Sequence, residues 1–592
     1  MTNHNRRKFL QTSIAAAAAM SGEEFGSFQD KDGHKLLAAG GGPLRAAGPA
    51  STGTPAKRIR MRKPYRLIIN DDGGRGYRNW VAPLTAEQFL DALFGPQIEG
   101  KPVDALFWCG LQNPGGGTWY KSKVGEPAGS WARSMRRKFR TARDWATVAT
   151  LQGLISQGHD PLVLVCKRCH ELGKDAWLSF RFNDHHGASG TLADAKLTRR
   201  YEERSDLRYS DGEEETKWNY TRSEVRDYVY SLLQEAYLEY DVDGVELDFM
   251  RSPGYFPKDK IGEGKELLNG FMKKLRALAD QAADKKGRPQ GLAVRLPSYE
   301  PACAEVGLDW RRWVKEGWVD VLTASCFQSA EHEADMAPFV EGCRDSRTQV
   351  YWCIESTPGF PNVEIHKQLL WGVYGGQSTG PSTANFRAMA LGAYEQGVDG
   401  LYFFNLFFAF ERYATHPDAA FLHELHDPDL LRGRDQTYLV SRQTPDSHSA
   451  FFKCAPPRPL PSALTPEKPE CSFGLTVGAD LKQAAASKKL RSARLRLCLT
   501  GLTSLDTLAV AWDGEELAGE FEPPVTPGSW QIFGGGHFWV GDLLSQGRAP
   551  RRGKHQCTVR LKSRNPEVSE GISIQFAELD VRFWHKPGMP DS

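Results

Sequence analysis

From about residue 63 onward, short apolar runs alternate with longer segments in which apolar residues recur every three or four positions. The short runs predict buried β-strands and the longer segments predict amphipathic helices. Their alternation is typical of a parallel sheet with crossover helices. Eight strands are predicted, at 65–70, 103–109, 176–182, 244–249, 291–296, 319–324, 349–355 and 400–405.

Three of the intervening helices are well marked. The segment 221–240 has one apolar face, and Thr221 with Glu224 predicts a capping box at its start. The segments 265–282 and 382–396 show the same periodicity. Helices of this length between short strands are what βα units require.

A weak internal repeat indicates how the sheet closes. Val-Asp pairs begin at 242, 319 and 398, so they are 77 and 79 residues apart, and each opens a predicted strand. Two βα units of near-constant length favour a closed (β/α)8 TIM barrel. The alternative is an open doubly wound sheet, which would normally carry a glycine-rich phosphate loop after its first strand. The segment 71–76 lacks the G-x-G-x-x-G spacing and carries two acids.

After about residue 433 the helical periodicity stops. The segments 493–499, 508–512, 555–561 and 572–584 are alternating and rich in β-branched or aromatic residues, which predicts a β-sandwich. We therefore divide this part of the chain into a catalytic barrel, 63–432, and an accessory sandwich domain, 433–592. The sandwich either binds carbohydrate or packs against the barrel.

The N-terminal residues are not expected to belong to either domain. Arg6 and Arg7 precede Ile14 and a run of alanines, and this order over residues 1–30 resembles a twin-arginine export signal rather than a basic tail. Residues 31–62 are rich in Gly, Ala, Pro and Ser, which predicts a flexible linker. The protein is therefore expected to be exported, to the periplasm or beyond.

Charge and hydropathy exclude two classes of partner. The chain has 75 basic and 73 acidic residues, and its formal charge of +2 argues against nucleic-acid and membrane-surface binding. No stretch of about 18 apolar residues occurs, which argues against an integral membrane protein.

Two motifs suggest cofactors, but neither is persuasive. Cys166, Cys169 and His170 match the C-x-x-C-H pattern of covalent haem attachment, yet the two cysteines also lie at apolar helical spacing. An exported haem protein is therefore a minor alternative. His185 and His186 are adjacent, a spacing at which both rings rarely reach one metal ion. We predict neither a cofactor nor a metal.

In a (β/α)8 barrel the chemistry lies at the carboxyl ends of the strands, and the fourth strand is the most informative. Alternation turns Val245, Leu247 and Phe249 toward the helices and Glu246 and Asp248 into the barrel. Two carboxylates on one face tend to raise one pKa, which general-acid catalysis can use. In a purely structural alternative, one of them pairs with an inward-facing arginine, and the same alternation supplies Arg181, Arg251 and Arg295.

The seventh strand adds a second acidic position. Its alternation turns Tyr351, Cys353 and Glu355 inward, with Glu355 at the carboxyl end, and Glu300 follows the fifth strand. Both glutamates are candidate catalytic residues. Polar and aromatic residues near the same rim are candidates for binding substrate hydroxyls and sugar rings. These are Asp71, Asp72, Trp108, Arg181, Asn183, His185, Arg251, Arg295, Tyr351 and Asn405.

Two motifs resemble those of glycosyl-hydrolase-like barrel proteins, distant relatives of the alpha-amylase-type barrels. The segment 243–253, DGVELDFMRSP, is similar to the family's strand-four signature. The segment 308–320, LDWRRWVKEGWVD, is similar to its stretch before strand six. The resemblance extends over the barrel, from about residue 63 to 430.

The resemblance implies hydrolysis of glycosidic bonds in a poly- or oligosaccharide, with Asp248 at the position of the strand-four nucleophile. The proton donor stays open among Glu246, Glu300 and Glu355, because the family's strand-five acid is only loosely matched. The partner is thus a carbohydrate, with no oligomeric state predicted. Other barrel chemistry, such as that of a lyase, and a non-catalytic carbohydrate-binding barrel are the alternatives.

Overall fold

The computed structural model describes most of the chain beyond the N-terminal region. The predicted export signal and linker, and His185 with His186, lie outside the described residues. The described ranges are 64–77, 84–95, 97–139, 141–184, 198–210, 217–326, 334–355, 382–406, 419–440, 452–454, 459–522 and 537–584.

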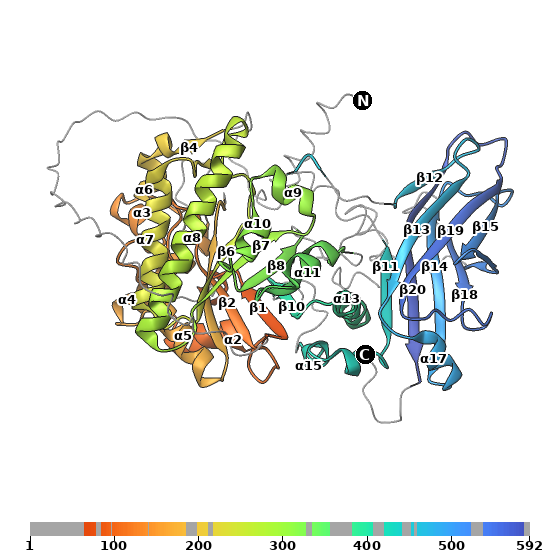
Figure 1. Cartoon of the computed structure of the whole chain (residues 1–592), viewed down its shortest axis with the longest axis horizontal. Helices are drawn as coiled ribbons and strands as arrows, with labels where there is room; N and C mark the ends of the chain where they lie inside the picture. Colours follow the sequence, from red (N-terminus) through yellow and green to blue (C-terminus); the bar gives the residue numbers. More distant parts are fainter. Residues whose placement is uncertain are drawn as a thin grey trace. The chain divides into compact units, whose positions relative to one another are not determined.

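Eight parallel strands close into a barrel in the order β1-β10-β9-β8-β7-β6-β3-β2, which confirms the predicted TIM barrel (Figure 1). All eight predicted strands are present, with ends that differ by no more than two residues. They are β1 Leu67–Asp71, β2 Ala105–Leu111, β3 Asp175–Arg181, β6 Gly244–Asp248, β7 Gly291–Pro297, β8 Val321–Ser325, β9 Gln349–Glu355 and β10 Gly400–Phe404.

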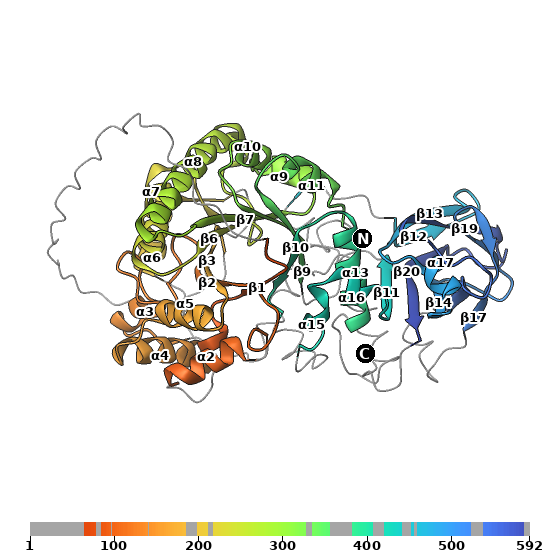
Figure 2. The ribbon, with the colours of Figure 1, turned by 60° about the horizontal axis from the view of Figure 1, so that its bottom comes forward.

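Helices lie outside these strands (Figure 2). The three well-marked helices are α7 (Ser223–Glu239), α8 (Ile261–Lys286) and α13 (Thr383–Glu395), and Ser382 caps α13 by accepting from the N–H of Asn385. The other helices of the barrel region are α2 Ala86–Phe94, α3 Ser130–Ser134, α4 Ala142–Ser156, α5 Pro161–Glu171, α6 Arg199–Glu203, α9 Glu300–Glu305, α10 Trp310–Lys315, α11 Ala337–Cys343, α15 Leu422–Leu425 and α16 Pro428–Leu431.

The capping box predicted at the start of α7 is wrong. Helix α7 begins at Ser223, its N-cap is Arg222, and no side chain caps it. The Thr221 hydroxyl instead donates to Oδ1 of Asn219 at 2.7 Å, within the turn that precedes the helix.

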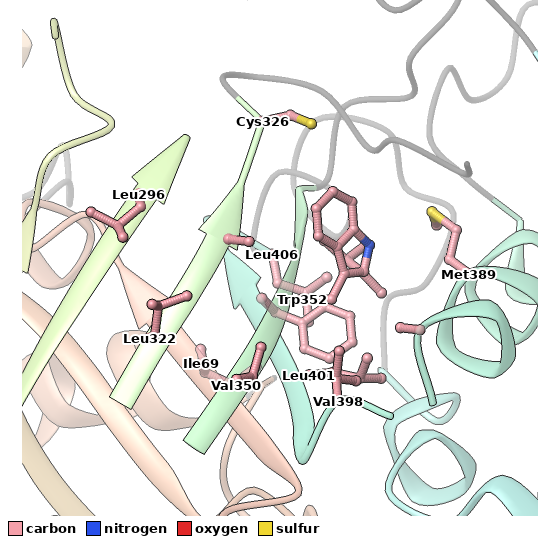
Figure 3. Close-up of a cluster of buried hydrophobic side chains, with 14 of the residues drawn as sticks. Ile69, Leu296, Leu322, Cys326, Val350, Trp352, Met389, Val398, Leu401 and Leu406 are labelled. Carbon is pink, nitrogen blue, oxygen red and sulfur yellow. The ribbon is translucent and has the colours of Figure 1, made fainter. Parts of the chain in front are cut away.

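The main hydrophobic core lies between the strands and the helices. Val350 and Trp352 of β9, Leu322 of β8 and Leu401 of β10 point outward from the barrel, and Met389 of α13 lies among them (Figure 3). On β6, Val245, Leu247 and Phe249 belong to this outer core, as alternation predicted. A second apolar cluster fills the inside of the barrel and is supplied by the alternate positions.

The C-terminal region forms the predicted β-sandwich of two antiparallel sheets. One sheet has the order β11-β20-β14-β18-β17, with β12 paired to β20, and the other has the order β13-β19-β15-β16. Alternate residues of β20 are buried, which is typical of a strand with one face in a core. The strands are β11 Gln436–Val440, β12 Ser462–Leu464, β13 Glu470–Val477, β14 Leu490–Thr500, β15 Thr507–Trp512, β16 Glu515–Leu517, β17 Glu520–Glu522, β18 His537–Asp542, β19 Gly553–Ser563 and β20 Ile572–Phe583.

Candidate active site

Charged side chains gather inside the barrel toward the carboxyl ends of its strands. Arg181 of β3, Asp248 of β6 and Arg295 of β7 are direct neighbours in register. One layer deeper, Glu246 lies between Ser179 and Ala293. The inward direction of Glu246 and Asp248 therefore follows from the two-residue period of β6, as predicted.

Arg295 joins two carboxylates. Its Nη1 donates to Oδ2 of Asp248 at 3.1 Å, and its Nη2 donates to Oε1 of Glu355 at 2.6 Å. Ser325 of β8 accepts from Nε at 3.1 Å and from Nη2 at 2.8 Å, and the guanidinium lies 3.8 Å from the centre of the Phe404 ring. We call Asp248, Arg295 and Glu355 the bridged triad.

The bridged triad is buried inside the barrel. The side chains of Asp248 and Arg295 are fully buried, and that of Glu355 is 5% exposed. Burial by itself lowers the pKa of Arg295, but the nearby Asp248 and Glu355 carboxylates outweigh it, so the pKa stands well above its usual value. Arg295 therefore keeps its charge at any working pH.

Glu246 lies in a different environment, among neutral hydrogen-bond donors. Ser179 donates to its Oε2 at 2.6 Å, and Asn70 donates to the same oxygen at 3.2 Å. The Tyr402 hydroxyl lies 2.8 and 3.0 Å from Oε1 and Oε2. Burial, with the neighbouring charge of Asp248, raises the pKa of Glu246 to about 7.

A second charged group lies on the neighbouring strands. Arg181 pairs with Asp72, which follows β1, and its Nη1 donates to Asp184 at 3.1 Å. Burial, together with the nearby charge of Arg251, lowers the pKa of Arg181. Because Arg181 already has two acidic partners, Asp248 pairs with Arg295 instead.

The structure brings Asp72, Arg181, Arg251, Arg295, Asp248 and Glu355 to this end of the barrel, as the sequence predicted. Asn405 lies there too, directly after β10, and its N–H donates to the carbonyl of Asn70 at 3.1 Å. Asn405 has a φ of 52°, and within the described part of the chain its buried Oδ1 has no hydrogen-bond partner.

The solved structures that the chain matches include glycosidases and a glucanotransferase, each at a TM-score below 0.5. A cycloisomaltooligosaccharide glucanotransferase from Paenibacillus sp. matches with a TM-score of 0.26 and 8% identity, over 87% of this chain and 57% of that one. An alpha-L-fucosidase from Paenibacillus thiaminolyticus matches with a TM-score of 0.35 and 12% identity, over 62% of this chain and 49% of that one. The galactosidase domain of an alpha-galactosidase-sucrose kinase matches with a TM-score of 0.32 and 11% identity, over 85% of this chain and 55% of that one.

The chain thus spans about half the length of these proteins. At these identities and TM-scores, no residue role is carried over from these proteins. No family model and no curated protein matches the chain. The closed barrel of eight parallel strands confirms the fold that the resemblance implied, while the narrower link to amylase-type barrels stays a prediction.

Several predicted site residues have structural roles instead. Asp71 accepts from Gln97 at 3.2 Å and from the N–H of Gly73 at 3.0 Å, which fixes the turn after β1. A Cβ on Gly73 would lie 1.8 Å from the carbonyl oxygen of Cys109, so this turn requires glycine. Trp108 is buried in the core outside the barrel.

Three more predicted residues lie away from the bridged triad or have their polar atoms occupied. The Tyr351 hydroxyl donates to Gln349 at 2.6 Å, at the amino end of β9. The Asn183 amide donates to the Gly254 carbonyl and accepts from the N–H of Trp218. Glu300 opens α9 and pairs with Arg311 at the surface, where its side chain is 32% exposed.

The haem motif also has a structural explanation. Cys166 and Cys169 are buried in the outer core on α5, and burial raises the pKa of Cys166 to about 12. His170 lies 2.8 Å from Asp243 at the amino end of β6. Both cysteines are therefore explained as core residues of α5, and the haem alternative stays a prediction. Among the described residues, no cluster of three His, Cys, Asp or Glu side chains could hold a metal, and no helix is long and apolar enough to cross a membrane.

Sequence reasoning missed the residues that support Glu246 and Arg295. These are Asn70, Ser179, Ser325 and Tyr402. Each lies at an inward position of its strand, so the two-residue period that selected Glu246 would also have selected them.

Proposed function

We propose that the barrel is a glycoside hydrolase in which Asp248 and Glu355 are the catalytic pair. The observation that carries this proposal is the bridged triad: two carboxylates at the carboxyl ends of β6 and β9, held by one arginine. Catalytic groups of TIM barrels lie at this end. A guanidinium that contacts both carboxyl groups keeps them within roughly 8 Å of each other.

That spacing suits glycoside hydrolysis. Retaining enzymes hold their two carboxyl groups about 5 to 5.5 Å apart, and inverting enzymes about 6.5 to 9.5 Å. In either case we assign to Asp248 the attack on the anomeric carbon or the activation of a water, with Arg295 holding its carboxyl group in place.

Glu355 is the proposed proton donor to the leaving oxygen. Glu246 is one layer deeper, and Glu300 is paired at the surface, which leaves Glu355 as the glutamate at the level of Asp248. The substrate would be a poly- or oligosaccharide.

The test is reducing-end release by the full chain on neutral and acidic polysaccharides, with Glu355→Gln and the matched control Glu300→Gln. We expect Glu355→Gln to reduce release about a hundredfold or more, with external azide restoring part of the rate on an activated substrate if the enzyme is retaining. Glu300→Gln should release sugar like the wild type. A loss confined to Glu300→Gln would refute the assignment.

One observation favours a second function, a non-catalytic carbohydrate-binding barrel. Asp248 is neutralised by Arg295 and fully buried, which is also what a structural ion pair requires. Under this alternative, calorimetry would detect sugar binding that Asp248→Asn leaves unchanged, and no polysaccharide would be cleaved.

We further propose that the protein is exported through its N-terminal segment. Arg6 and Arg7 before the alanine run support this proposal. In a bacterial host with a twin-arginine pathway, the wild type should appear in the periplasm and a variant with Arg6→Lys and Arg7→Lys should stay inside. Equal export of both would refute the proposal.

A further inference from the structure

Phe404 is an aromatic side chain in the charged layer of the barrel interior. It is the last residue of β10, it pairs in register with Glu355 of β9, and it is 2% exposed. Its side chain belongs to the apolar cluster inside the barrel, so the ring lies on the same side of the sheet as the Glu355 carboxyl group. An aromatic ring therefore stands at the level where the proposed catalytic pair is held.

Two guanidinium groups lie over the Phe404 ring. The central carbon of the Arg295 guanidinium is 3.8 Å from the ring centre, and that of Arg181 is 5.4 Å from it. Both arginines are buried, and they flank Asp248 in register on either side. A cation within about 6 Å of a ring centre is attracted by the negative face of the ring, and the attraction is strongest where water is excluded. One ring therefore attracts both the cation of the bridged triad and its neighbour on β3.

The ring adds a different kind of contact to those that already hold Arg295. Hydrogen bonds from the guanidinium nitrogens reach Asp248, Glu355 and Ser325. These bonds hold the edges of the planar group. The attraction of the ring acts on the cation as a whole, from the side where Phe404 lies. Together the two kinds of contact hold the guanidinium at the point from which it meets both carboxylates.

We propose that Phe404 is a positioning residue: the negative face of its ring holds the Arg295 guanidinium, which in turn keeps the two carboxylates of the bridged triad at a fixed separation. This inference rests on the proposed function. Because the ring is buried and acts through the arginine, weakening its attraction should slow the chemical step and leave the binding of sugar unchanged.

The test replaces Phe404 with mono-, di- and trifluorophenylalanine, each incorporated at an amber codon in the full chain. Fluorine withdraws charge from the ring face while the ring keeps nearly the same size, so packing is retained and the attraction for cations falls in steps. We expect the urea midpoint of unfolding to fall in the same order. The matched control is the same series at Phe403, the preceding residue of β10. Its ring is buried in the outer core, and among the described residues no guanidinium lies over it, so its midpoints should show no ordered fall.

Sugar release by the same variants gives the second readout. At Phe404, kcat per folded molecule should fall in the order of fluorination, by about tenfold for the trifluoro ring, with KM unchanged, while the series at Phe403 keeps the wild-type kcat. A ring that only fills space would give no ordered fall in either readout. Urea midpoints that do not fall in order at Phe404 would overturn the inference whether or not any sugar is cleaved, and so would falling midpoints with a constant kcat. Falling midpoints in a protein that cleaves no sugar would refute the hydrolase and support the hold of the ring on Arg295.

Discussion

The two halves of the barrel interior are built by the same strands but filled with opposite chemistry. Toward the amino ends, Tyr65, Phe107 and Trp177 form an aromatic plug, in which the Phe107 and Trp177 rings stack at 4.6 Å. Toward the carboxyl ends, the same alternating positions carry Asp248 and Arg295. In a TIM barrel the first half supports the fold and the second half carries the chemistry.

Room for the plug comes from two glycines. A Cβ would lie 2.4 Å from the Trp177 ring if added to Gly244 and 2.1 Å from it if added to Gly291. The indole therefore fills the space that β6 and β7 leave empty, and its N–H donates to the Tyr65 hydroxyl at 3.1 Å. Above this layer the strands carry larger polar side chains, and close packing gives way to hydrogen bonds and ion pairs.

The variant Asp248→Asn gives the strongest test of the difference between the two ends of the barrel interior. We expect reducing-end release to fall about a thousandfold or more, because the variant loses the nucleophile or base while keeping its shape. The control is Asp243→Asn at the opposite end of the same strand, where the carboxylate accepts from the N–H of Ala176. It should lower Tm but not the rate per folded molecule. Equal losses of activity in both would contradict the division between the two ends.

Arg295→Met should have one of the two largest effects on stability. It leaves two buried carboxylates without their shared cation, for which we expect a loss of about 3–5 kcal/mol in the free energy of unfolding by urea at pH 7. Arg311→Met, which breaks the surface pair with Glu300, should lose about 0–1 kcal/mol. Similar losses for the two variants would argue that the bridged triad is open to water.

Trp177→Ala tests the aromatic plug. Removal of a fully buried indole should cost about 3–5 kcal/mol in the free energy of unfolding, with kcat per folded molecule unchanged. Trp145 on α4 is 49% exposed, so Trp145→Ala should stay within about 0.5 kcal/mol of the wild type. A fall in kcat for folded Trp177→Ala would show that the plug also positions the catalytic layer.

The smallest effect concerns the C-x-x-C-H motif. Because burial raises the pKa of Cys166 to about 12, neither Cys166 nor Cys169 should react with iodoacetamide in the native protein, and both should react after unfolding. Peptide mass spectrometry measures this directly. A haem-bearing peptide, or native alkylation of these two thiols, would contradict the structural interpretation of the motif.

Periodicity was sufficient to predict the barrel, and its errors concerned the depth of residues along a strand, their pairing and, at Trp108, the face of the strand. Strand β9 has the predicted bounds, and both Tyr351 and Glu355 face inward as predicted. They are nevertheless about 13 Å apart along the strand, so Tyr351 belongs to the aromatic end and Glu355 to the charged end. For Trp108 the error was one of face, since its neighbour Phe107 is the residue inside the barrel.

The sequence by itself determined the eight strands, the sandwich and the inward direction of Glu246 and Asp248, because a two-residue period is a local property of the chain. Only the tertiary structure decided which arginine neutralises Asp248. Arg181 and Arg295 flank it in register on either side, and the choice depends on competing partners, since Asp72 and Asp184 already occupy Arg181. Such competition involves residues more than a hundred positions apart, which strand closure alone brings together.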